Sequence, residues 1–235
     1  MNERARSELR QIPERGSHDW AIVSAILDAG FLASVGFVMD GQPFVIPMLY
    51  GRADRSLFLH GAGASRIMTQ LAQGVPICAT VMLADGLVLA RSAFHHSMNY
   101  RSVVAFGTAT LVDDARTKLA GLRCISDHVL DGRWADVRGP NKRELAETAV
   151  LEMRIEEASA KIRTGPPNDD PADCQRSTWA GVLPLGLVAS APVPDAKTGA
   201  VAALPPYLAR LAGFRAPDPE RATFETVRKG STDGI

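Results

Sequence analysis

The sequence has few cysteines, few aromatic residues, no excess of charge and no long apolar run. Its three cysteines, Cys78, Cys124 and Cys174, are odd in number and widely spaced, which argues against a disulfide scaffold or structural zinc site and fits a reducing compartment. The 26 basic residues balance the 26 acidic ones, so no global field favours nucleic acid or an anionic membrane. An anionic ligand must therefore be held by a local cluster.

Several functional signatures are also missing. The polar N-terminus lacks the apolar core of a secretory signal, and no apolar segment is long enough to span a bilayer. We therefore expect a cytoplasmic protein without nucleic-acid or membrane partners. There is no G-x-S-x-G elbow, no Walker A loop and no set of ligands at zinc spacing, so the sequence predicts no serine hydrolase and no metal site.

The chain nevertheless contains enough apolar residues for a sizeable core, 46% of 235. Asp19 can cap a helix over 20–29, and Asp40-Gly41-Gln42 can join strands 31–39 and 44–50 as a hairpin. Pro43 and Pro47 favour an edge position for the second of these strands. The other expected elements are a strand at 56–59, a short helix after Ser65, a hairpin of 76–83 and 87–93 around Ala84-Asp85-Gly86, a strand at 102–112, helices at 113–129 and 142–147, and a strand at 148–155.

Asp-Gly turns with few intervening helices predict an antiparallel sheet that closes into a barrel. The fold class is therefore mainly β with flanking helices (α+β). From residue 164 the composition becomes rich in Pro and Asp, and from 188 in Ala and Pro. We expect a barrel domain over 1–187 and a partly irregular C-terminal segment over 188–235. Within this segment we expect a short helix in 204–214 and frayed backbone over the last dozen residues.

Many hydrogen-bond donors lie between two β-type runs, Leu87–Ala90 and Val103–Phe106. They are Arg91, Ser92, His95, His96, Asn99, Tyr100, Arg101 and Ser102. Guanidinium, hydroxyl and imidazole groups at strand ends indicate the wall of a ligand site. The alternative is a long polar hairpin loop in solvent. We favour the site because similar chemistry recurs at 60–66.

The segment from His60 to Arg66, HGAGASR, has the chemistry of an anion site. Glycines allow backbone amides to approach an anion, and the following helix would present free N–H groups. Ser65 adds a hydroxyl and Arg66 a planar fork suited to phosphate oxygens. A Gly-rich turn capped by Ser65, with His60 as a structural residue, is the alternative.

Several segments together resemble the pyridoxamine 5′-phosphate oxidase-like family of FMN-binding split β-barrels, in the branch of flavin-nucleotide-binding proteins related to nitroimidazole-resistance reductases. The resemblance spans about residues 10–187. It is carried by QPFVIPMLYGR (42–52), LFLHGAGASRIM (57–68), DGLVLARSAFHHSMNYRSVVAFGTATLV (85–112), EEASAKIRTGPPNDD (156–170) and WAGVLPL (179–185).

This resemblance implies roles for particular residues. Ser65 and Arg66 would hold the FMN phosphate, and Ile46, Pro47 and Met48 would line the flavin ring, with His60 close by. The remaining implied cofactor residues are Ser92, Tyr100 and Ser102 on the flanking strands, and Lys161, Arg163 and Trp179 reaching the flavin of a second copy in a homodimer. The substrate-phosphate residues of true pyridoxamine phosphate oxidases are not matched, so vitamin B6 oxidation is not expected.

The resulting hypothesis is a homodimeric FMN-dependent oxidoreductase that acts on a small molecule. His60 is the candidate proton donor, and Arg91, Arg101 or Lys161 could stabilise the reduced flavin electrostatically. Three alternatives stay open. The first is haem binding with His60, His95 or His96 as axial ligand, the second is non-catalytic flavin storage or sensing, and the third is a deazaflavin cofactor.

Overall fold

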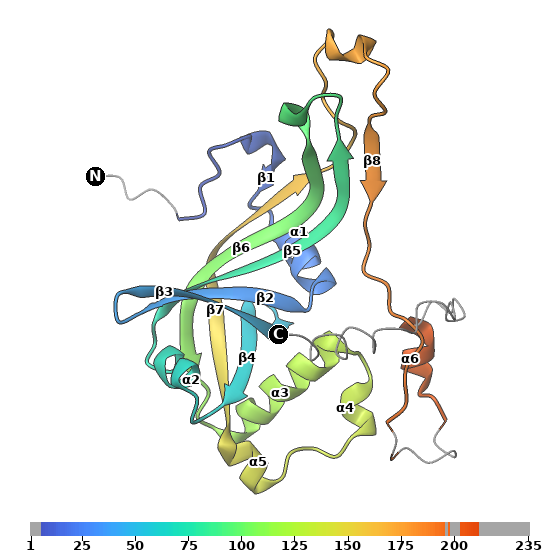
Figure 1. Ribbon diagram of the computed structural model, residues 1–235. Helices are drawn as coiled ribbons and strands as arrows, with labels where there is room; N and C mark the ends of the chain where they lie inside the picture. Colours follow the sequence, from blue (N-terminus) through green and yellow to red (C-terminus); the bar gives the residue numbers. More distant parts are fainter. Residues whose placement is uncertain (1–5, 196, 198–202, 212–235) are drawn as a thin grey trace, which may run out of the picture. The chain divides into compact units, whose positions relative to one another are not determined.

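A computed structural model describes residues 6–195, 197 and 203–211. The chain separates into two compact units, 1–186 and 187–235, each of which is described by itself. The first unit holds an eight-stranded antiparallel sheet (Figure 1). Six of the strands follow the order β7-β4-β3-β2-β5-β6, and pairing of β6 with β7 closes them into a barrel. The prediction of a mainly β, barrel-forming antiparallel fold is confirmed.

The strands are β1 (Gly16–Ser17), β2 (Leu32–Met39), β3 (Gln42–Ala53), β4 (Ser56–Ala62), β5 (Pro76–Leu89), β6 (Ser97–Leu111), β7 (Thr148–Arg163) and β8 (Gly181–Pro184). The helices are α1 (Trp20–Ala29), α2 (Arg66–Leu71), α3 (Ala115–Val129), α4 (Arg133–Asp136), α5 (Lys142–Glu147) and α6 (Pro206–Leu211). Short 3₁₀ turns occur at Pro13–Arg15, Ala93–His95 and Asp173–Gln175.

The helix α1 has the predicted bounds. The Asp19 side chain accepts a hydrogen bond from the Ala21 N–H, which satisfies one of the free donors of the first turn. Its apolar face buries Val23, Ile26 and Leu27 in the core. Local capping and the apolar period thus agree with the tertiary packing.

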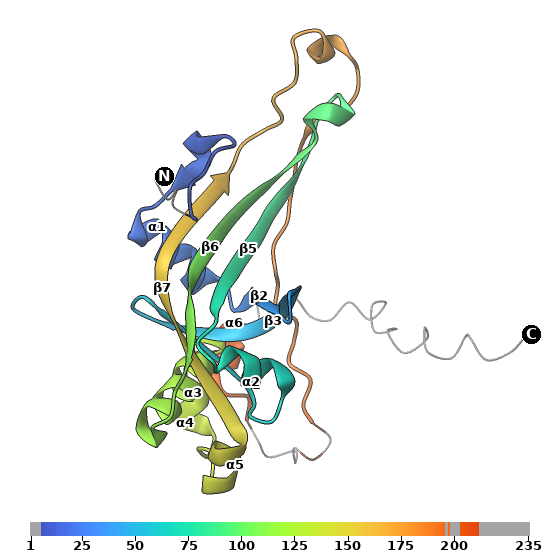
Figure 2. The same cartoon turned by 90° about the vertical axis from the view of Figure 1, so that its left-hand side faces the viewer.

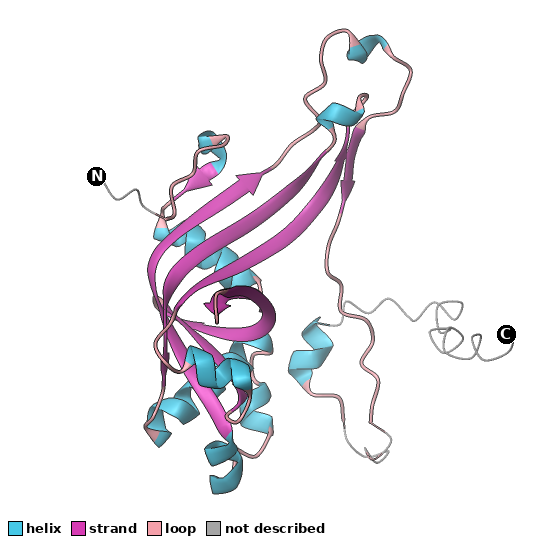
Figure 3. Cartoon of the chain, turned by 60° about the vertical axis from the view of Figure 1, so that its left-hand side comes forward, coloured by secondary structure: helices cyan, strands magenta, loops and turns pink. Residues whose placement is uncertain are grey.

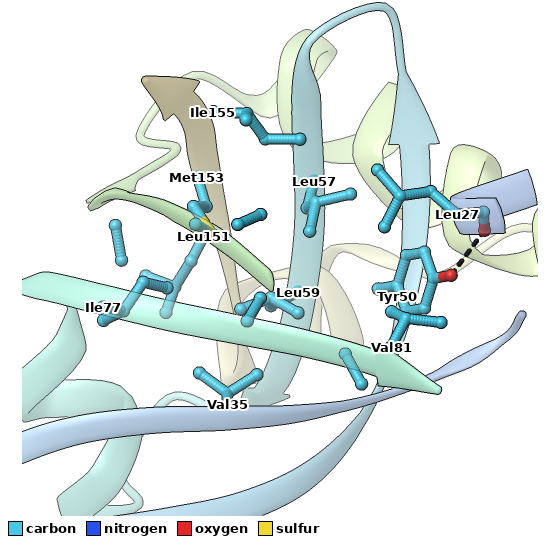
Figure 4. Close-up of a cluster of buried hydrophobic side chains, with 14 of the residues drawn as sticks. Leu27, Val35, Tyr50, Leu57, Leu59, Ile77, Val81, Leu151, Met153 and Ile155 are labelled. Carbon is cyan, nitrogen blue, oxygen red and sulfur yellow. Dashed lines mark hydrogen bonds between the residues drawn. The ribbon is translucent and has the colours of Figure 1, made fainter. Parts of the chain in front are cut away.

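The barrel interior is a continuous cluster of aliphatic side chains around Tyr50, which is fully buried (Figure 4). The Tyr50 hydroxyl lies within hydrogen-bond distance of the carbonyl oxygens of Leu27 and Gly30, so the ring joins α1 to the barrel without leaving a buried polar atom unpaired. On β3, a Cβ at Gly51 would lie 2.5 Å from the Ile125 nitrogen. Only glycine lets α3 pack this closely against the strand.

The predicted β2–β3 hairpin is present. Asp40 and Gly41 both have positive φ, at 53° and 75°, as a tight two-residue hairpin turn requires. Pro43 and Pro47 do not break β3. Residues 42–49 pair only with β2, because pairing with β4 begins at Tyr50, so both prolines lie on an unpaired edge as predicted.

The predicted hairpin around Ala84-Asp85-Gly86 is wrong. β5 runs through these residues as one strand, and a bulge between Ala84 and Gly86 absorbs the extra residue against β6. The Asp85 carboxylate is held by Arg101 on β6, at 2.9 Å from Nε and 2.7 Å from Nη2. An Asp-Gly pair that can turn a hairpin is here kept extended by its cross-strand partner.

Beyond Thr80, β5 loses β2 as a neighbour, and the β5–β6 ribbon projects from the barrel (Figure 3). β8 pairs with β5 there, opposite Gly86–Leu89. We call residues 83–101, the loop 164–180 and β8 the extension. β4, β6 and β7 are all longer than predicted, because their polar ends also pair in the sheet. The short helix α4 was not predicted.

In the second unit, α6 lies within the segment 204–214 that was predicted to contain a short helix. The predicted fraying of the last dozen residues lies outside the described residues.

Candidate functional site

A pocket of ≈ 290 Å³ lies where β3, β4 and α2 meet. It brings together five of the predicted site residues, namely Ile46, Pro47, Met48, His60 and Ser65. Leu49, Gly61, Ile67 and Met68 complete the lining. Residues from two segments that resembled flavin-binding regions in the sequence therefore line one pocket.

The turn between β4 and α2 positions Ser65. The Gly63 N–H donates to the Glu147 carbonyl at 2.8 Å, which fixes the Gly-rich turn against the start of β7. The Ser65 hydroxyl accepts from the Met68 N–H at 3.2 Å and caps the six-residue α2. The capping role weighed in the sequence is real, but the hydroxyl keeps its own proton for donation into the pocket.

Arg66 follows Ser65 and is largely exposed. Its only polar side-chain contact among the described residues is with the Asp40 carboxylate, 3.4 Å from Nη2, where both side chains are open to solvent. Such an exposed pair contributes little free energy. Arg66 is not among the residues that line the pocket. As the first residue of α2 it follows Ser65 directly, and its solvent-open guanidinium is available to an anionic ligand.

His60 lies at the end of β4, opposite Val150 of β7, and lines the pocket. Although much of its surface is exposed, desolvation by the surrounding atoms lowers the pKa of the imidazole. The neutral ring thus predominates near pH 7, with one nitrogen able to donate and the other able to accept a proton or a metal.

The other four histidines are engaged. His18 Nδ1 lies 3.0 Å from the Ala158 carbonyl, His95 Nε2 3.3 Å from Asp170, His96 Nε2 3.2 Å from the Ala90 carbonyl, and His128 Nε2 2.7 Å from the Gly30 carbonyl. Within the described ranges, His60 is the histidine with no hydrogen-bond or ion-pair partner.

Arg91, at the distal end of β5, binds Asp169 rather than lining the pocket. Its backbone N–H and its Nη1 each lie 2.8 Å from a carboxylate oxygen of Asp169. Although desolvation works to raise the pKa of Asp169, the hydrogen bonds and charge of Arg91 lower it overall. Arg91 thus ties the loop 164–180 to the ribbon.

Two further predicted site residues lie on the extension. Ser92 precedes the 3₁₀ turn Ala93–His95, and its hydroxyl makes no capping bond there. Trp179 lies just before β8 with 66% of its surface exposed. Neither residue lines the pocket between β3, β4 and α2.

Tyr100, Ser102 and Lys161 lie on adjacent strands. Ser102 is directly opposite Lys161, and Tyr100 is opposite Arg163, so all four side chains share one face of β6–β7. The Ser102 hydroxyl donates to the Lys161 carbonyl at 3.3 Å. The structure brings these residues to one another and not into the lining of the pocket.

Sequence reasoning missed part of the pocket. Leu49 directly follows the predicted run 46–48, and Ile67 and Met68 lie in the first turn of α2 after Ser65. Extending each motif by one to three residues would have included all three. No group of three or more histidine, cysteine or acidic side chains that could hold a metal occurs in the part of the chain that the structure describes. In the same part, no helix is long and apolar enough to cross a membrane.

Residues 19–162 match the family described as pyridoxamine 5′-phosphate oxidase. The flavocytochrome Anf3 from Azotobacter vinelandii is 38% identical, with a TM-score of 0.82 over 88% of this chain and 96% of that protein. The FAD and haem binding protein from Mycobacterium smegmatis is 34% identical, with a TM-score of 0.80 over 84% and 97% of the two chains.

A putative 5-nitroimidazole resistance protein from Bacteroides thetaiotaomicron shares the fold at 20% identity. Its TM-score is 0.54 over 63% of this chain and 86% of that one. The curated proteins include no match. Since the two flavin- and haem-related structures cover more of this chain than 19–162, the similarity to them extends beyond the common barrel.

Proposed function

Because this chain belongs to the pyridoxamine 5′-phosphate oxidase family, we propose that it binds a flavin nucleotide in the pocket between β3, β4 and α2 and acts as a redox protein. The observation that carries the proposal is the convergence of Ile46–Met48, His60 and Ser65 on one pocket. When bound, a flavin supplies one- and two-electron transfer.

The donor set fits the phosphate of a flavin. The Ser65 hydroxyl has a proton to give, and Arg66 offers a planar fork that is bound only loosely to Asp40. FMN and FAD share the phosphate next to the ribityl chain, so these two residues would serve either nucleotide. The two relatives of highest identity reported above carry FAD or a flavin in their names, which makes FAD as well as FMN a cofactor to test.

The apolar part of the pocket fits an aromatic ring system. Ile46, Pro47 and Met48 form one wall, and His60 lies beside them with a neutral imidazole. In this arrangement His60 would donate or accept a proton next to a reacting atom, because neither of its nitrogens is taken by another described residue. A small-molecule substrate is proposed to approach the open side.

We propose that the working form is a homodimer. The pocket is at the small end of the ligand-site range, so a second copy would add the missing wall. The outer face of β2, β3 and β5 carries exposed apolar side chains, a common property of subunit interfaces. They are Val38, Val45, Leu49 and Met82, which are 60%, 67%, 39% and 56% exposed.

The roles that the sequence suggested for the remaining site residues are also proposals. Tyr100, Ser102 and Lys161 share a face on which a cofactor could lie, and Arg91, Ser92 and Trp179 are carried by the extension. A domain boundary between residues 187 and 188 and a cytoplasmic location are proposed likewise.

Haem binding is the second candidate function, favoured by the names of the flavocytochrome and of the FAD and haem binding protein. Of the three histidines proposed as axial ligands, His95 and His96 already use Nε2 within the chain. His60 keeps both nitrogens free of described partners, and imidazole is a common haem ligand. His60 is thus the first ligand to test.

Fluorescence titration of cofactor-depleted protein with FMN and with FAD tests the flavin proposal. Saturable quenching with micromolar or tighter affinity is expected, and absence of binding for both nucleotides contradicts it. Reduction of the bound flavin by a nicotinamide cofactor would support an oxidoreductase, whereas tight binding without turnover would favour storage or sensing. For haem, a Soret band lost in His60→Ala but kept in His95→Ala and His96→Ala supports His60, and a band unchanged in all three excludes these ligands.

A further inference from the structure

Three cationic side chains gather where β7 ends, and none of them forms an ion pair with a carboxylate among the described residues. They are Arg15, Lys161 and Arg163, which we call the β7-end cluster. We propose that this cluster is an oxyanion-binding site that takes a carboxylate or phosphate group. Where that group belongs to a flavin or haem, the inference rests on the proposed function; where it belongs to a separate small molecule, it does not.

Arg163 is the most buried of the three, with only 7% of its surface exposed. Its guanidinium contacts the Asn99 side-chain oxygen and the carbonyls of Gly165, at 3.4 Å, and Pro166, at 3.3 Å. All three acceptors are neutral. A buried charge is ordinarily matched by an opposite charge, so the positive charge of Arg163 lacks its counterpart.

The hydrogen bonds of Arg163 are also incomplete. Its Nε is buried and has no acceptor among the described residues, and Nη2 has one acceptor for two protons. Nε and Nη2 together form the side of a guanidinium that binds two oxygens of a carboxylate or phosphate. The missing partner thus has a defined chemistry, namely an anion with two oxygens.

Arg15 and Lys161 add to the positive charge. Burial lowers the pKa of Arg163, and repulsion from Arg15 lowers it further, whereas Tyr100 acts in the opposite direction. Lys161 pairs with Gly16 in the β1–β7 ladder, and Gly16 directly follows Arg15 in the chain. The Lys161 ammonium donates to the Gln11 carbonyl at 2.7 Å, another neutral acceptor. In Figure 2 the blue N-terminal segment that contains β1 lies beside the end of β7.

Three other partly buried arginines of the barrel and the extension each have a carboxylate partner, although Arg91, like Arg163, also has a buried Nε without an acceptor among the described residues. Arg52 pairs with Asp28, Arg91 with Asp169, and Arg101 with Asp85. Each of these cations is neutralised within the chain and has little net charge to offer. The β7-end cluster differs in that no carboxylate among the described residues neutralises it.

Calorimetric titration of the purified protein with inorganic phosphate, at constant ionic strength in chloride, tests the inference. The informative variant is Arg15→Gln, because no described residue depends on the Arg15 side chain for a hydrogen bond. Arg163→Lys removes the fork but keeps the charge. Arg154→Gln is the matched control, since it removes an exposed arginine from the middle of the same strand.

If the natural anion is a separate molecule, the parent and Arg154→Gln bind phosphate saturably. Arg15→Gln and Arg163→Lys then bind it at least about tenfold more weakly. If the anion belongs to a cofactor, the loaded protein excludes phosphate, and Arg15→Gln weakens flavin or haem retention at least about tenfold while Arg154→Gln does not. Equal phosphate affinity and equal cofactor retention in Arg15→Gln and Arg154→Gln would overturn the inference. Arg15-dependent phosphate binding by a protein that holds neither cofactor would uphold it and defeat the proposed function.

Discussion

His60 lines the pocket between β3, β4 and α2 without a described polar partner, and Arg66, the first residue of α2, has only a long, exposed contact with Asp40. On the extension, Arg91 and Arg101 each form a shorter, partly buried ion pair with an aspartate, and His95 contacts Asp170. The residue types are the same in both regions. In the extension, Asp169 and Asp85 neutralise Arg91 and Arg101. The contacts of Asp169 with Arg91 and of Asp170 with His95 tie the loop 164–180 to the β5–β6 ribbon. At the pocket, the hydrogen-bonding capacity of His60 and the charge of the neighbouring Arg66 stay available.

The difference shows that a cluster of arginine and histidine does not by itself mark an anion site. What matters is whether the fold supplies a counter-charge. A guanidinium that already binds a carboxylate of the chain has fewer N–H donors, and less net charge, left for an anionic ligand. Four substitutions test this contrast between the two regions.

The largest effect is expected for Arg66→Ala. Hydrogen bonds to charged groups contribute roughly 1.5–3 kcal/mol, so flavin affinity should fall about 10- to 100-fold while the fold is kept. Fluorescence titration with FMN and FAD measures this. Arg154→Ala, which removes an exposed arginine of β7, is the matched control. Equal flavin affinity of Arg66→Ala and the parent would remove the phosphate role from Arg66.

Arg91→Ala is expected to release the loop 164–180, because Asp169 would lose its guanidinium partner. Limited proteolysis within this loop should become about tenfold faster, since local opening exposes its backbone. Flavin affinity measured on the same sample decides whether Arg91 also serves the cofactor. Unchanged proteolysis would show that the Asp169 pair does not hold the loop.

Arg101→Gln should have a smaller effect, because the Arg101–Asp85 pair is partly exposed. The free energy of unfolding is expected to fall by about 0.5 kcal/mol in urea denaturation. The pair also lowers the pKa of Asp85, chiefly through the hydrogen bond from Arg101. This contribution to stability is present above the unfolded-state pKa of an aspartate and is lost as the pH falls. If Arg101→Gln remained less stable than the parent at acidic pH, where Asp85 is protonated, the ion pair would not be the origin of the difference.

The smallest effect concerns His60, whose pKa is lowered by desolvation. Its unfolded form binds a proton near pH 6.5, whereas the folded form resists protonation, so the parent loses stability as the pH falls below about 6.5. His60→Asn should remove this part of the pH dependence. Thermal unfolding of the parent and of His60→Asn between pH 5 and 8, where histidine titrates, measures this difference. If stability depended on pH in the same way in both proteins, His60 would not be desolvated.

Much of the fold could be predicted because its signals are local. The Asp19 cap and apolar period define α1, and Asp40-Gly41 defines the β2–β3 turn. The failed hairpin at Ala84–Gly86 has the opposite cause. Asp85 is kept in a bulged strand by Arg101, sixteen residues away, and no local pattern reports such a cross-strand partner.

The candidate site shows the same limit. The pocket residues Ile46–Met48, His60 and Ser65 belong to two short motifs, so the sequence was sufficient to place them together. The pairing of Arg91 with Asp169 joins residues 78 positions apart. The lack of a carboxylate partner for Arg163 within the described part of the chain depends on how loops fold around it. Which cations are neutralised is a tertiary property, which sequence patterns do not contain.

The most direct test of the account is the visible absorption spectrum of the protein purified without added cofactor and then reconstituted with FMN, FAD and haem. We predict two flavin bands that bleach on addition of dithionite, with flavin released on denaturation, and a Soret band in addition if the haem candidate also holds. A protein that shows no flavin bands as purified and gains none with either nucleotide would contradict the central claim that the pocket between β3, β4 and α2 is a flavin site.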